Sequence, residues 1–149
     1  MVSVKFEEKE IKGSPFTYDV LAAVDFFGAG KRFEMLYDAK VHGYSITTFH
    51  QKCDQVNGTV TLVTLKNGAK FSGYNPDNWS GGGIWKNVPT AFLFSLTDGK
   101  GSEPQKYSLK PEKEGTAIYG FVNQGPFWRR FAFFVSTHRQ FNSPHLPFW

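Results

Sequence analysis

Cysteine is nearly absent from this sequence, since Cys53 is the only one among 149 residues. A lone cysteine cannot close an intrachain disulfide, so the fold must depend on burial and hydrogen bonds, as in proteins of a reducing compartment. Long apolar runs are absent too: none approaches the roughly 18 residues that cross a bilayer, and the N-terminus lacks an apolar signal segment. The sequence therefore predicts a soluble cytoplasmic or nuclear protein without membrane insertion.

Strong positive charge and clustered metal ligands are also lacking. The 17 Lys and Arg against 13 Asp and Glu give a net charge of +4, and their scattered positions are not typical of a nucleic-acid-binding protein. One Cys and four dispersed His do not match the four closely spaced ligands of a structural zinc site. The glycines at Ser80 to Gly83 lack the Lys-Ser/Thr ending of a phosphate-binding loop. We therefore expect no nucleic acid, no metal and no cofactor.

Aromatic residues are abundant, with 16 Phe and an aromatic share of 17%. Together with a chain of 149 residues, this supplies enough apolar surface for one domain with its own core. Two stretches have helical spacing. Thr17 to Phe27 predicts an amphipathic helix that ends at the glycines after Phe27. Ile46 to Cys53 predicts a short helix capped by Ser45, with Cys53 on its apolar side.

The remaining pattern predicts strands. The clearest element is a hairpin in which Thr59 to Leu65 and Lys70 to Asn75 are joined by Asn67-Gly68. A polar loop is expected from Asn75 to Gly83. Further strands are predicted at 32–39, 91–96, 106–110, 117–122 and 131–135. The fold class is therefore α+β, with two antiparallel β-sheets packed as a sandwich and a few flanking short helices.

A series of short motifs follows in one order along the chain. They are Leu36-Tyr37, Gly43-Tyr44-Ser45, Phe49 with Cys53-Asp54, the strand Thr59 to Leu65, Phe71 to Tyr74 ending at Trp79, Ala91 to Leu96, and Ala117 to Trp128. In kind and order they resemble the TLD (TLDc) domain of the oxidation-resistance protein family. The resemblance indicates a single TLD-like domain over residues 1–149, clearest over 13–128. It departs from the family at Ser72, where glycine is usual, and over residues 129–149.

The resemblance implies a function as well as a fold. It implies a non-enzymatic protein-interaction domain with a role in resistance to oxidative stress, and the vacuolar proton-pumping ATPase as its partner. Asp77, Trp79 and Trp85 lie in or beside the polar loop and form the candidate interaction loop. Two alternatives apply to the same residues: the two tryptophans could stack on a sugar in a carbohydrate-binding sandwich, or they could cover the core.

The alternative function is that of a thiol-based antioxidant or enzyme in which Cys53 is a redox thiol. His50, His42 or Glu34 would then be its acid or base. The helical spacing argues against it, because it places Cys53 on the apolar side, where a free cysteine is usually a buried structural residue. We therefore assign no catalytic residue and expect the protein not to be an enzyme.

Overall fold

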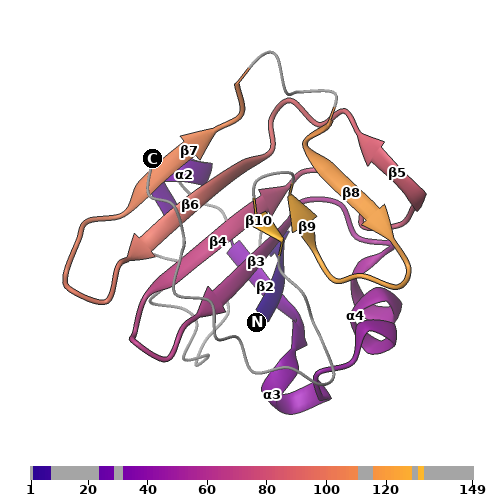
Figure 1. The fold of residues 1–149 in the computed structure, drawn as a ribbon, viewed down its shortest axis with the longest axis horizontal. Coiled ribbons are helices and arrows are strands. Elements are labelled where there is room, and N and C mark those ends of the chain that lie inside the picture. The colour runs from indigo at the N-terminus through magenta and orange to yellow at the C-terminus, as the bar shows by residue number, and fades with distance from the viewer. Residues whose placement is uncertain (1, 8–23, 29–31, 111–115, 129–130, 133–149) are drawn as a thin grey trace.

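The computed structural model describes residues 2–7, 24–28, 32–110, 116–128 and 131–132. Within them the chain forms two antiparallel sheets with short helices (Figure 1). The elements are β1 (Val2–Glu7), α2 (Val24–Phe27), β2 (Arg32–Asp38), α3 (Ala39–His42), α4 (Ile46–Cys53), β3 (Thr59–Thr64), β4 (Lys70–Asn75), β5 (Gly82–Lys86), β6 (Phe92–Thr97), β7 (Gln105–Ser108), β8 (Ile118–Phe121), β9 (Phe127–Trp128) and β10 (Phe131–Ala132).

The larger sheet has six strands in the order β2-β1-β3-β4-β6-β7. Its β3–β4 hairpin pairs Thr59 with Asn75 and Thr64 with Lys70, and Gly68 has a φ of 86° in the turn, so the predicted hairpin is confirmed. Glycine suits that left-handed conformation because it has no Cβ. Strand β1 lies between β2 and β3, a position for which the sequence pattern predicted no strand.

The smaller sheet has four strands in the order β10-β9-β8-β5. The prediction of a loop continuing to Gly83 is wrong at its end, because β5 begins at Gly82. Two glycines at its start and a register shift between Gly82 and Ile84 hide the alternation that marks a strand. Strand β9 was also missed, whereas β6, β7 and β8 match predicted strands.

The helices are short and are fixed by side-chain caps. Ser45 Oγ accepts from the Thr48 N–H at 3.2 Å at the start of α4, and Phe49 and Cys53 are buried on that helix, as predicted. Helix α3 was not predicted, and Asp38 Oδ1 caps it by accepting from the Lys40 N–H at 2.9 Å.

Some predicted elements extend beyond the described residues. Helix α2 is the final turn of the helix predicted from Thr17 to Phe27, whose earlier part lies outside the described residues. The same holds for most of the strand predicted at 131–135 and for the chain from 133 to 149.

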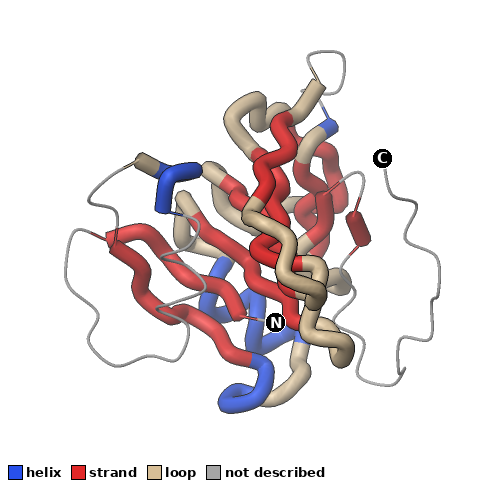
Figure 2. Tube along the Cα trace, turned by 90° about the vertical axis from the view of Figure 1, so that its left-hand side faces the viewer, coloured by secondary structure: helices blue, strands red, loops and turns tan. Residues whose placement is uncertain are grey.

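The two sheets pack as a sandwich, and the larger one is covered on both faces (Figure 2). Alternating residues Phe92, Phe94 and Leu96 of β6 belong to a cluster on one face, and Phe26 and Phe27 of α2 pack against it. On the opposite face a second cluster joins β2 and α4 to the smaller sheet. Its members are Tyr37, Ala39, Phe49, Cys53, Trp79, Val88, Ala91, Ala117, Ile118 and Trp128.

The contact between the sheets depends on a glycine. Trp128 of β9 is 3% exposed, and an added Cβ at Gly73 of β4 would lie 2.5 Å from its indole ring. That separation is far below van der Waals contact, so only glycine lets the ring lie against β4. Ser72, the departure from the family pattern, fits because its hydroxyl donates to the Thr61 carbonyl at 2.7 Å.

We expect Gly73→Ala to lower the free energy of unfolding by about 1–3 kcal/mol, the usual cost of overpacking a core. Either the Trp128 ring or β4 must move to make room for the methyl group. Denaturant unfolding followed by tryptophan fluorescence measures the change. Gly82→Ala is the matched control, because a Cβ there meets nothing within 4 Å. Equal losses in the two variants would contradict the packing argument.

Candidate functional site

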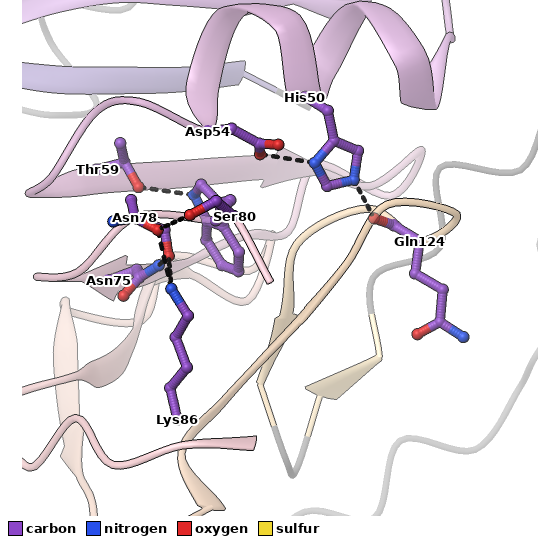
Figure 3. A network of polar contacts seen from close by, with 9 residues as sticks. His50, Asp54, Thr59, Asn75, Asn78, Ser80, Lys86 and Gln124 are labelled. Atoms are coloured by element: carbon purple, nitrogen blue, oxygen red, sulfur yellow. Dashed lines mark hydrogen bonds and ion pairs between the residues drawn. The ribbon is translucent and has the colours of Figure 1, made fainter. Parts of the chain in front are cut away.

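The loop between β4 and β5 is organised around one lysine (Figure 3). Lys86 Nζ donates to the backbone carbonyl of Asn78 at 2.9 Å and to its Oδ1 at 2.9 Å, and lies 3.2 Å from Asp77 Oδ2. The three donor hydrogens of the ammonium thus have three acceptors. The Lys86 side chain is 14% exposed, so this satisfied ammonium fixes the loop rather than offering a free charge.

Residues 75–80 of this loop are joined to one another by side-chain hydrogen bonds. Asn75 is fully buried, and its Oδ1 accepts from the Asp77 N–H at 3.0 Å. Asp77 Oδ1 accepts in turn from the Asn78 N–H at 2.8 Å, and the Ser80 hydroxyl contacts Asn78 Oδ1. Such Asx turns replace backbone pairing where a chain changes direction. Asp77, predicted as an interaction residue, here forms part of the loop's own scaffold.

Trp79 does not offer its ring to a partner, so that prediction is wrong. The side chain is 1% exposed, its Nε1 donates to Thr59 Oγ1 at 2.8 Å, and its ring meets Trp128 edge to face at 4.9 Å. A large aromatic side chain with a satisfied N–H is a core residue. The alternative that this tryptophan covers the core is confirmed.

Trp85 has the opposite environment, since 40% of it is exposed. Its ring centroid lies 5.1 Å from that of Tyr119 and 5.7 Å from that of Phe127. Phe121 extends the row, 6.1 Å from Tyr119. We call Trp85, Tyr119, Phe121 and Phe127 the outer aromatic face. Ile84 and Val122, which adjoin these residues in the chain, are also exposed, at 60% and 59%.

The outer aromatic face follows from strand geometry. Successive side chains of a strand point to opposite faces, so buried Ile118 alternates with Tyr119, and buried Trp128 follows Phe127. Tyr119, Phe121 and Phe127 were not predicted to be partly exposed. The alternation in 117–122 could have indicated two of them, but their meeting with Trp85 depends on the unpredicted β5.

The polar loop and the outer aromatic face are coupled through β5. Lys86 turns towards the loop while its neighbour Trp85 lies on the outer face. The segment before β5 runs against β8, because an added Cβ at Gly81 would lie 2.7 Å from the Gly120 carbonyl oxygen. The network of Lys86 therefore sets the position of the strand that presents Trp85.

The structure does not bring the proposed acid and base residues onto Cys53. Cys53 is fully buried. The His50 ring nitrogens meet Asp54 Oδ1 at 2.6 Å and the Gln124 carbonyl at 2.8 Å. His42 Nδ1 accepts from the Asp38 N–H at 3.0 Å, and Glu34 is exposed on β2. The prediction of an inward-facing cysteine is confirmed.

Near this helix, burial raises the pKa of Tyr37. Its hydroxyl donates to the Gly43 carbonyl at 2.6 Å, and burial in an apolar cluster disfavours the charged form. Tyr37 therefore acts as a neutral donor that holds the turn between α3 and α4.

Within the described ranges, no three His, Cys, Asp or Glu side chains come together as a metal site could require. No helix in the same part of the chain is long and apolar enough to cross a membrane.

The fold and this surface define a two-sheet α+β domain with a hydrogen-bonded polar loop and a partly exposed aromatic face. A family model described as TLDc domain matches residues 17–128, more than half of the chain, and the chain belongs to that family. Comparisons with curated proteins and with solved structures gave no match. The assignment of residues 1–149 to one domain stays a prediction.

We expect Lys86→Met to lower the free energy of unfolding by about 1–3 kcal/mol, because it removes the two hydrogen bonds of Lys86 to Asn78 and its ion pair with Asp77. It should also weaken the pairing of β5 and expose its amides to hydrogen exchange. Lys66→Met is the control, since Lys66 is exposed in the β3–β4 turn. If both variants are equally stable, the network does not hold the loop.

We expect the Cys53 thiol of the native domain to react with a small thiol reagent about a thousandfold or more slowly than in denaturant. Such a factor follows where reaction requires opening at a cost of roughly 5 kcal/mol. Labelling kinetics, read by mass, measure it. Rapid labelling without denaturant would show an accessible thiol and revive a redox role for Cys53.

Proposed function

We propose that this TLDc domain is a protein-interaction domain without catalytic activity of its own, and that it docks on its partner through the outer aromatic face. The observation that carries the proposal is Trp85, which is 40% exposed and contacts two further aromatic rings on paired strands. Tryptophan and tyrosine side chains dominate the binding energy of many protein interfaces. A rigid platform also limits the entropy lost when the complex forms.

We further propose a role in resistance to oxidative stress, exerted in the cytoplasm or nucleus by binding the vacuolar proton-pumping ATPase. This step is supported by membership of the TLDc family and by what that resemblance implies. The buried position of Cys53 favours a protective role through protein contacts over direct thiol chemistry, because a peroxide-reactive thiol must be accessible.

A carbohydrate is the second candidate ligand for the same face. Trp85 and Tyr119, with ring centroids 5.1 Å apart and planes inclined by 51°, are a pair of the kind that could stack on a sugar ring. Soluble glycans would then quench tryptophan fluorescence in the wild-type domain and not in Trp85→Phe. Binding to a protein requires no such effect of glycans.

We expect Trp85→Ala to reduce capture of the ATPase's peripheral subunits by about tenfold or more, as for a central interface tryptophan. The tagged domain is incubated with lysate of its source organism, and the recovered subunits are quantified by mass spectrometry. Tyr107→Ala is the matched control: Tyr107 is 49% exposed, but it lies on β7, the edge strand of the larger sheet. Near-ultraviolet circular dichroism verifies that both variants fold.

Two outcomes would contradict separate parts of the proposal. Unchanged capture by folded Trp85→Ala would mean that the outer aromatic face is not the docking surface. Failure of the wild-type domain to recover these subunits would remove the ATPase as partner and leave the docking surface to be tested with other proteins.

A further inference from the structure

His50 joins two elements that are far apart in the sequence (Figure 3). It lies on α4 and is 7% exposed. Its Nδ1 is 2.6 Å from Asp54 Oδ1 on the same helix, and its Nε2 is 2.8 Å from the backbone carbonyl oxygen of Gln124. Gln124 belongs to the turn between β8 and β9, so the imidazole forms a bridge from α4 to the smaller sheet.

Both partners of this ring are acceptors. A backbone carbonyl can only accept, and an ionised carboxylate can only accept, so each bond needs a hydrogen on the ring nitrogen. Neutral imidazole has one N–H, whereas the imidazolium has two. The observed geometry is therefore satisfied in full when His50 carries a positive charge. Its place in the last turn of α4 suits a cation, because the carbonyl end of a helix is partly negative.

We infer that His50 is a proton-dependent latch: the doubly protonated ring ties α4 to the turn at Val122 to Gln124, and loss of one proton releases that turn. A neutral ring keeps one N–H. The bond to the Asp54 carboxylate is the stronger of the two because its acceptor is charged. The hydrogen therefore stays on Nδ1, and the bond from Nε2 to Gln124 is lost.

Among the described residues, the ion pair of the ring is with Asp54. The turn itself, from Val122 to Pro126, contains no ionisable side chain. On the other side, the Tyr37 ring contacts Phe49, the neighbour of His50. Because the closed latch needs the extra proton, its stabilisation is present at acidic pH and is lost as the pH rises and the ring deprotonates.

The latch acts on the hairpin that carries the outer aromatic face. Tyr119 and Phe121 precede the released turn, and Phe127 follows it. Release leaves the Gln124 N–H bonded to the Phe121 carbonyl at 3.0 Å, so the hairpin loosens from α4 without losing its own turn. Its effect on docking rests on the proposed function, whereas the latch is a property of the domain alone and is tested without a partner.

Asp54→Asn separates the two states of the latch. An asparagine amide can donate to Nδ1 of a neutral ring, whose Nε2–H then keeps the Gln124 carbonyl. The variant should therefore hold the turn at every pH. Amide hydrogen exchange of residues 121–125 is compared between wild type and Asp54→Asn at the same pH, from about pH 5 to about pH 9, a range that spans the usual titration of histidine. The ratio cancels the intrinsic pH dependence of exchange.

We expect the wild-type turn to exchange about two- to tenfold faster than the variant at the alkaline end, the effect of losing one hydrogen bond, and equally fast at the acidic end. Amides of the β3–β4 hairpin should show no such change. Nitrogen NMR of the histidine rings reports the protonation state of His50, and the faster exchange should appear together with the neutral ring. A constant exchange ratio, or a ring already neutral at acidic pH, would overturn the latch. If Asp54→Asn does not fold, the ring spectra of the wild type decide alone.

Discussion

The indole of Trp128 lying on the backbone of β4 at Gly73 is the contact on which the two-sheet arrangement depends. It lets β9 approach the larger sheet closely enough for Trp79 to meet Trp128 edge to face. Around this pair the cluster from β2, α4 and β8 fills the space between the sheets. A close-packed interior transmits small displacements, so the position of the smaller sheet, and of everything it presents, is set at this point.

Trp79 is a core residue and Trp85 is a surface residue, and the hydrogen bonds and ion pair of Lys86 account for the difference. Lys86 satisfies the carbonyl and amide oxygens of Asn78 together with the Asp77 carboxylate, which draws the loop inward and leaves Trp79 beneath it. One residue earlier in β5, strand alternation turns Trp85 to the opposite side. The Lys86 ammonium thus lies between a structural tryptophan and a surface one within a short stretch of chain.

Local signals were enough to predict elements whose pairing is local. The β3–β4 hairpin has its Asn-Gly turn, and α4 has its Ser45 cap, so both could be predicted and both are confirmed. Strands β1 and β5 could not be predicted in this way, because their partners are distant in sequence and β5 begins with two glycines. The outer aromatic face was missed for the same reason. Its rings come from β5, β8 and β9, and only tertiary pairing brings them together.

The position of β1 between β2 and β3 affects the order in which the strands can pair during synthesis. Residues 2–7 are synthesised before both of their neighbours in the sheet, β2 and β3. Long-range pairing of this kind is slow, because the loop between the partners must close before any contact is gained. During synthesis β1 therefore stays unpaired until β2 has emerged, and its other edge stays open until β3 follows. A protease or chaperone that recognises extended chains would encounter β1 during that interval.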